Sequence, residues 1–432
     1  MAQIDLQIRP SNTLIPRVIL GVAVVVALIF GWVAIRRQFG NMIAELTSTS
    51  DPAAGQMAEI AYSMAPSDPL TMWLKATIEK NIFTPERTDA AVKMFEQTVR
   101  LSPRDFRWWI ELGRAYEQDE KPAQAEAALK QAIALAPAYT FPHWQLGNFY
   151  LRQNRRDEAF AELKLATENN QTYREQVFSL AWEYFDKNPA KLEEIAADRP
   201  DVHASLAMFY AQRGRAADSL RNWNMLNDEQ KASFPQIASA IAQGLYDRRF
   251  YPQALEFARQ LGIDPDSRPE AVTNAGFEKL LGNADDTKFG WRVLRNEGKL
   301  DIATDSSVHH DGAKSARLSF KGFSKPELYA LGQNVVVEPG RSYKLSFWLR
   351  TESLRSAGMP QLQVVNGVDD KIITLSSAFP SGTNDWQLIT IDFTAPAECT
   401  AVVIRTVRGF CGQECPITGT LWYDDFDLKR LN

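Results

Sequence analysis

The segments WIELGRAY, residues 109–116, and HWQLGNFY, residues 143–150, carry one pattern at positions 34 residues apart. Leu112, Gly113 and Tyr116 of the first segment match the leucine, glycine and tyrosine of the second. A glycine lets two antiparallel helices approach closely, while leucine and tyrosine fill the seam between them. The spacing therefore predicts a stack of helical hairpins.

The same register continues into the helix that follows each segment. The matching residues are Ala125, Leu129 and Ala132 in the first unit, and Ala159, Leu163 and Ala166 in the second. This pattern resembles the tetratricopeptide repeat, whose hairpins stack into an α-solenoid. The resemblance implies a tetratricopeptide-like repeat domain over residues 67–265, with roughly five to six hairpins. It also implies a protein partner in the repeat groove, and it favours a binding scaffold over a catalyst.

The segment from Val18 to Ile35 contains no charged residue, and Arg17 and the Arg36–Arg37 pair bound it. As a helix it is about 27 Å long, close to the hydrocarbon thickness of a bilayer. No Ala-x-Ala-like cleavage site follows it. We therefore predict a transmembrane helix over residues 18–35, with a cleaved signal peptide and a buried soluble helix as the alternatives.

The location of the remaining chain follows from this anchor. A short tail before a single span is easily kept in the cytoplasm, and the long remainder of the chain is then exported. We expect residues 1–36 to form a cytoplasmic tail and the anchor, and residues 37–66 to form a linker. The expected location is the bacterial inner membrane, crossed once, with the bulk of the chain periplasmic or extracytoplasmic.

Length and charge bound the remaining possibilities. A chain of 432 residues exceeds one compact domain, so several domains are expected. The net charge is −5 and no long basic stripe is present, so we predict no nucleic-acid binding.

From about residue 270 the periodicity of apolar residues changes to two. Tyr343, Leu345, Phe347 and Leu349 alternate with polar or aromatic neighbours, and turn signals such as Glu338-Pro339-Gly340 separate short runs of this kind. This spacing is typical of an antiparallel β-sandwich. The predicted fold class is thus multidomain α + β: a transmembrane helix, an α-solenoid and a sandwich over residues 270–432.

The order of landmarks in residues 270–432 resembles the galactose-binding-like jelly roll of carbohydrate-binding modules attached to xylanases and related hydrolases. The landmarks are Asn274 to Glu278, Phe289-Gly290-Trp291, Asp311 to Ser315, Pro339-Gly340, Tyr343 to Arg350, Trp386, and Trp422 to Phe426. In that family a structural calcium commonly ties the first strand to the last. The resemblance places it at Glu278, Asp424 and Asp425, although these acids are equally explained as turn caps or solvated groups.

A sugar site needs an outward aromatic ring and planar polar groups. Strand alternation predicts that Trp348 and Arg350 face outward, and a glycan site is completed by polar residues on other strands: Gln361, Gln363 and Arg405. In the family the open face of one sheet forms the sugar groove. An outward Trp348 is also expected if the sandwich docks onto the repeats through it. We expect Trp291, Trp386 and Trp422 in the core.

The three cysteines lie near the carboxyl end of the chain. Cys411 and Cys415 form a disulfide candidate in a loop-like GFCGQECP segment, with a zinc half-site as the alternative. Cys399 is interpreted as a buried thiol or a further disulfide partner.

Catalytic motifs are missing from the sequence. It has no H-E-x-x-H, no G-x-S-x-G and no glycine-rich phosphate loop, so we predict that the protein is not an enzyme and carries no catalytic cofactor. The resulting hypothesis is a membrane-anchored adaptor that binds a protein through its repeats and polysaccharide through its jelly roll, in exopolysaccharide or cell-envelope glycan assembly. The alternatives are a purely structural interaction scaffold without sugar binding and an accessory that targets a glycoside hydrolase.

Overall fold

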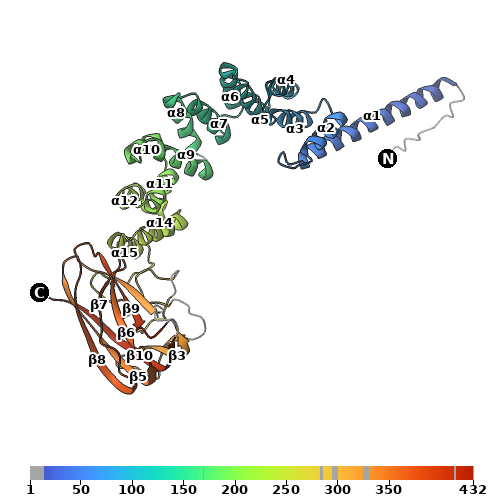
Figure 1. Ribbon diagram of the computed structural model, residues 1–432. Coiled ribbons are helices and arrows are strands. Elements are labelled where there is room, and N and C mark those ends of the chain that lie inside the picture. Colours follow the sequence, from blue (N-terminus) through green and yellow to red (C-terminus); the bar gives the residue numbers. More distant parts are fainter. Residues whose placement is uncertain are drawn as a thin grey trace, which may run out of the picture. The chain divides into compact units, whose positions relative to one another are not determined.

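A computed structural model of the chain describes residues 14–168, 170–282, 286–293, 300–324, 331–412 and 415–431 (Figure 1). The chain divides into two compact units, one ending at Ala197 and the other beginning at Asp198. The first unit is helical, and the second combines helices with a β-sandwich.

Helix α1 (Leu14–Leu46) opens the described part of the first unit. Its stretch from Arg17 to Leu46 contains an 18-residue window with a mean hydropathy of 2.9, of which none is buried. Membrane anchors and signal sequences share this length and composition. The sequence therefore contains one N-terminal helix, within the described residues, that is long and apolar enough to cross a membrane.

The predicted linker over residues 37–66 is helical instead. Helix α1 continues to Leu46, and helix α2 (Ala54–Met64) turns back against it. Small residues bring the two helices together: an added Cβ at Gly40 would lie 2.9 Å from the Ala61 carbonyl oxygen. The Ser, Thr, Asp and Pro residues at 47–52 thus form the turn of a hairpin rather than the start of a linker.

Four further hairpins follow in the first unit. Their helices are α3 (Pro69–Lys80), α4 (Pro85–Leu101), α5 (Phe106–Gln118), α6 (Pro122–Leu135), α7 (Thr140–Arg152), α8 (Arg156–Glu168), α9 (Gln171–Tyr184) and α10 (Pro189–Ile195). Asp68 caps α3 by accepting a hydrogen bond from the Leu70 N–H at 3.0 Å, and proline occupies the first turn where no donor is needed.

The 34-residue register is visible in the contacts. An ideal Cβ at Gly113 would lie 2.8 Å from Leu129 Cγ, and one at Gly147 would lie 2.8 Å from Leu163 Cγ. Trp109 Nε1 donates to the Pro103 carbonyl at 2.9 Å. His143 stands in the tryptophan position of the next repeat, and its Nε2 lies 3.4 Å from the Pro137 carbonyl. The repeat prediction is confirmed at the level of these helix–helix contacts.

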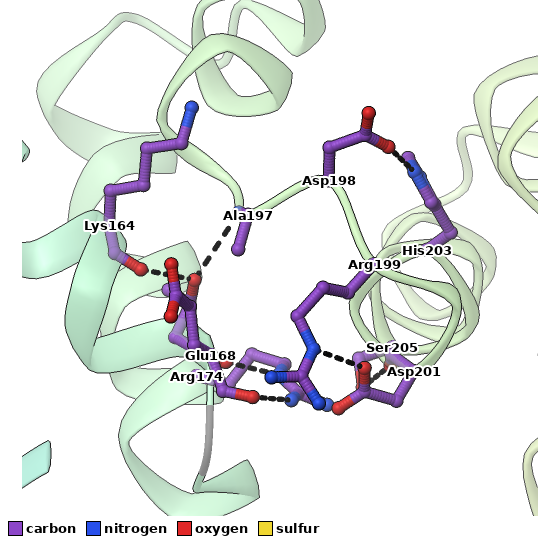
Figure 2. A network of polar contacts seen from close by, with 10 residues as sticks. Lys164, Glu168, Arg174, Ala197, Asp198, Arg199, Asp201, His203 and Ser205 are labelled. Carbon is purple, nitrogen blue, oxygen red and sulfur yellow. Dashed lines mark hydrogen bonds and ion pairs between the residues drawn. The ribbon is translucent and has the colours of Figure 1, made fainter. Parts of the chain in front are cut away.

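The α9–α10 hairpin is held to the preceding helix α8 by hydrogen bonds at the carboxyl end of α8. Arg174 Nε donates to the Thr167 carbonyl at 2.9 Å, and its guanidinium also reaches the Glu168 carbonyl at 3.3 Å. The backbone N–H of Ala197 donates to Thr167 Oγ1 at 3.4 Å. Figure 2 shows Arg174, Glu168 and Ala197 in this network. The guanidinium thus satisfies carbonyls that the end of α8 leaves without helical partners.

The second unit begins with α11 (Pro200–Gln212) and α12 (Ala216–Asn224), followed by the short α13 (Asp228–Ala232) and the hairpin of α14 (Pro235–Asp247) and α15 (Tyr251–Gln260). At the start of α11, Arg199 Nε donates to Asp201 at 3.2 Å, and His203 Nε2 lies 2.9 Å from Asp198 Oδ1 (Figure 2). These contacts fix the first turn of α11, so His203 has a structural explanation.

Two five-stranded antiparallel sheets form the sandwich. Sheet A has the order β1 (Arg292–Val293), β4 (Leu331–Val336), β9 (Ala401–Arg408), β6 (Pro360–Asn366) and β7 (Ile372–Leu375). Sheet B has the order β2 (Leu300–Asp305), β3 (Ser315–Ser324), β10 (Cys415–Arg430), β5 (Ser342–Ser356) and β8 (Gly382–Thr394). The predicted fold class is confirmed.

The alternation in β5 decides which side chains enter the core. Tyr343, Leu345, Phe347 and Leu349 are at most 1% exposed and belong to one core cluster between the sheets.

Of the three tryptophans predicted to lie in the core, Trp291 joins that cluster, as expected. Trp386 and Trp422 do not belong to it: Trp422 lies opposite Arg350 in the strand register, and Trp386 contacts His310, which stacks on Trp348. Trp422 is nevertheless buried there, and its Nε1 donates to Asp305 at 3.0 Å.

We predict that Gly113→Leu destabilises the helical unit by roughly 1–3 kcal/mol, because the new side chain would overpack the seam against Leu129 and the Ala125 carbonyl. Thermal unfolding followed by circular dichroism measures this loss. Gly55→Leu is the matched control, since an exposed glycine in α2 has no atom within 4 Å of an added Cβ. Equal melting temperatures for the two variants would show that the seam is not closely packed.

A second prediction concerns pH. His143 Nδ1 lies 2.6 Å from Glu162 Oε2, and this carboxylate raises the pKa of His143 above its usual value of about 6.5. The pair therefore stabilises the fold fully below pH about 6.5, and this stabilisation is lost as the pH rises through the raised pKa. The melting temperature relative to that of His143→Trp, measured from pH 5 to 9, should fall across this range. A difference that is constant with pH would contradict the pairing.

Candidate functional site

The five predicted glycan residues lie on two different faces. Trp348 and Arg350 belong to β5 of sheet B, whereas Gln361, Gln363 and Arg405 belong to β6 and β9 of sheet A. The two sheets turn their outer faces in opposite directions. The predicted set therefore cannot contact one ligand together, and the two groups are separate candidate sites.

On sheet B the Trp348 ring is already covered. The His310 imidazole stacks on it with ring centroids 3.9 Å apart and an interplanar angle of 17°. His310 is fixed in turn by Asp425 Oδ2, 2.7 Å from its Nδ1, and by its own N–H, which donates to Asp424 Oδ2 at 2.8 Å. Sugar stacking needs an open ring face, and the histidine occupies one face of this tryptophan. Arg350 is 3.7 Å from Asp385 and is similarly engaged.

On sheet A two of the three predicted polar residues are hydrogen-bonded to each other. Arg405 Nε donates to Gln363 Oε1 at 2.8 Å. Gln361, two residues earlier on β6, donates to the Ser376 carbonyl at 3.0 Å. The strand register places Gly332 of β4 opposite Arg405, so the neighbouring outward residue Asn334 belongs to the same face. Planar amide and guanidinium groups thus line the centre of this sheet.

The outer face of sheet A is partly covered by the hairpin of α14 and α15. Tyr251 is 6% exposed and packs in a cluster that includes Val336 and Ala401. Its hydroxyl donates to the Gly367 carbonyl at 3.0 Å. Arg249, in the turn between the helices, pairs with Asp370 at 2.5 Å and also donates to the Val368 carbonyl. The hairpin is therefore docked by apolar, neutral polar and ionic contacts together.

A cavity of about 360 Å³ remains where the hairpin meets the open part of the sheet. This volume is near the lower end of the roughly 300–1,000 Å³ that is typical of small-ligand sites. Its lining combines two tyrosines, two arginines and small or polar residues: Tyr246, Tyr251, Arg292, Gly332, Asn334, Asp370, Val403 and Arg405.

Side chains in this cavity restrain one another. Arg292 lies over the Tyr246 ring, with the guanidinium carbon 5.1 Å from the ring centroid, and donates to Asn334 Oδ1 at 3.3 Å. Burial raises the pKa of Tyr246 and the pKa of Tyr251. Both phenols are therefore protonated at neutral pH and serve as hydrogen-bonding groups and apolar surfaces, not as bases.

The predicted calcium residues lie around one turn, but their oxygens meet N–H groups. Glu278 Oε1 accepts from the N–H of Ala313 at 2.7 Å, and the buried Asp424 accepts from the N–H of His310 and of Asp425. Burial raises the pKa of Asp424. No group of three or more His, Cys, Asp and Glu side chains among the described residues is arranged to hold a metal. The calcium site stays a prediction from the resemblance.

The cysteines differ in state. Cys411 is disulfide-bonded, and Cys399 is a buried free thiol whose pKa is raised to about 11 by burial. The predicted pairing of Cys411 with Cys415 involves a side chain outside the described ones.

Sequence reasoning missed five residues of the sheet A site: Tyr246, Tyr251, Arg292, Asn334 and Asp370. Strand alternation was a usable signal for Asn334, because it lies between the inward residues Gln333 and Val335. The tyrosines had no such signal, because they belong to the last repeat hairpin and reach the sheet only through the tertiary fold. The stacking of His310 on Trp348 likewise left no signal in the sequence.

Residues 107–139 match the family model of the tetratricopeptide repeat. No curated protein sequence matches this chain.

Among solved structures, a CBM4 module is 15% identical over 37% of this chain and 99% of its own, with a TM-score of 0.28. TmCBM61 in complex with β-1,4-galactotriose is 19% identical over 38% of this chain and 100% of its own, with a TM-score of 0.26. A MamA fragment from Desulfovibrio magneticus RS-1 is 21% identical over 31% of this chain and 72% of its own, with a TM-score of 0.26. Residues 107–139 therefore carry a tetratricopeptide repeat, and the C-terminal sandwich consists of two five-stranded antiparallel sheets.

Proposed function

We propose that the protein is a non-catalytic, membrane-anchored adaptor whose jelly roll binds glycan on the outer face of sheet A. The observation that carries this proposal is the polar cluster of Arg405, Gln363 and Asn334 beside a cavity with two tyrosines. Planar amide and guanidinium groups suit the paired hydroxyls of a pyranose, and aromatic rings suit its C–H face.

The other end of the molecule has a different role in this proposal. Helix α1 anchors the chain in the bacterial inner membrane, with the repeats and the sandwich in the periplasm or outside the cell. Stacked repeats present extended surfaces that bind other proteins, so the repeat groove takes a protein partner. An anchored protein with both surfaces would hold a polysaccharide near a protein of exopolysaccharide or cell-envelope glycan assembly.

A purely structural role is the second candidate, and one observation favours it. The α14–α15 hairpin covers part of sheet A through Tyr251, Val336 and Ala401, so this face already serves as an internal docking surface. In that case the sandwich would only stabilise the end of the repeats. Glycan binding distinguishes the two roles.

We expect the full chain in detergent to bind glycans, and Gln363→Ala and Arg405→Ala each to weaken binding about tenfold or more, because each removes a hydrogen-bonding group from the site. Binding to a broad glycan array identifies the ligand, and titration calorimetry measures the change. Trp348→Ala on the opposite sheet is the matched control and should retain binding. Loss of binding in Trp348→Ala alone would move the site to sheet B, and no binding on the array would favour the structural role.

For the anchor, we expect the full chain to sediment with bacterial membranes and to be released only by detergent, because burying 18 uncharged residues in lipid is strongly favourable. A reporter fused after Asn432 should signal a periplasmic location. A shortened, soluble mature chain would instead identify α1 as a cleaved signal sequence.

A further inference from the structure

We propose that the cavity between the α14–α15 hairpin and sheet A recognises the terminal residue of an acidic glycan through the carboxylate of a uronic acid. This inference rests on the proposed glycan-binding function and adds the ligand class and the part of the ligand that is bound. It makes the last repeat hairpin a part of the binding site.

The shape of the site indicates a chain end. The strand register aligns outward positions across the sheet, from Arg292 on β1 through Gly332 on β4 to Arg405 on β9 and Gln363 on β6. At the β1 end of this row the Tyr246 ring of the hairpin lies against Arg292, and the hairpin also packs on Val336 and Ala401, two rows further along β4 and β9. A glycan that lies across the strands therefore stops against the tyrosines of the hairpin, and the cavity of about 360 Å³ holds a small terminal group rather than a continuing chain.

The charges that line the cavity indicate an anion. Arg292 and Arg405 are cationic, and Asp370 is the single carboxylate among the lining residues. Asp370 is paired with Arg249 of the helical hairpin, which lies outside the lining. Among the lining residues arginines therefore outnumber carboxylates, and the one carboxylate already has a cationic partner.

Arg292 has capacity for a ligand. It contacts the ring face of Tyr246, hydrogen-bonds the Tyr246 hydroxyl and donates to the neutral amide oxygen of Asn334. Its Nε is a buried donor without a hydrogen-bond partner among the described residues. A planar guanidinium held in place by an aromatic ring is well suited to a bidentate contact with a carboxylate, and such charge-assisted bonds are stronger than neutral ones. Arg292 is therefore the specificity-determining residue in this proposal.

The test compares an acidic with a neutral disaccharide on the full chain in detergent micelles. The probes are cellobiouronic acid, which ends in glucuronic acid, and cellobiose, which carries glucose at the same position. Titration calorimetry should give a dissociation constant about ten- to a hundredfold lower for the acid, as expected for one charge-assisted contact. Arg292→Gln should bring the ratio of the two constants close to one.

Arg355→Gln is the matched control, since Arg355 is exposed on β5 of the other sheet, and it should keep the wild-type ratio. Melting temperatures of both variants verify that they are folded. Equal affinity for the two probes, or an unchanged ratio in Arg292→Gln, would overturn the acidic-ligand inference while leaving glycan binding intact. Failure of both probes and of the glycan array would overturn the proposed function as well.

Discussion

The docking of one helical hairpin on one face of the sandwich is the constraint on which the candidate site depends. Sheet A has an outer face with apolar residues at one end and amide and guanidinium groups at its centre. The apolar end, with Val336 and Ala401, is buried under Tyr251 and its neighbours. Burying this surface is favourable because apolar side chains leave water, and the neighbouring amide side chains Asn334 and Gln363 are buried as well.

The ionic contact of the hairpin has an electrostatic consequence for the site. Arg249 pairs with Asp370, which is the single carboxylate among the residues that line the cavity. A hairpin that docked only through apolar residues would have left that carboxylate beside the two arginines. The same contact that holds the repeat end to the sandwich therefore sets the charge of the cavity.

Sheet B shows the opposite arrangement. Its outward aromatic residue, Trp348, is stacked against His310, and His310 is tied to the Asp424–Asp425 pair. The acids that the family resemblance assigned to calcium thus hold a histidine and backbone N–H groups here. These hydrogen bonds tie the turn before β3 to β10, the strand that pairs with β3 in sheet B.

The sequence by itself determined the elements and their faces. The 34-residue register identified the helical hairpins because each needs a small residue, such as Gly113, where two helices touch, and the two-residue alternation in β5 identified the side chains of the core. Both signals are local, since a helix or strand repeats its faces at a fixed spacing. Only the tertiary structure decided that Trp348 and Gln363 lie on opposite sheets, and that Tyr246 of a repeat helix lies beside Arg292 of a strand. Alternation tells inward from outward within one strand, but it does not tell which sheet a strand joins or which helix covers it.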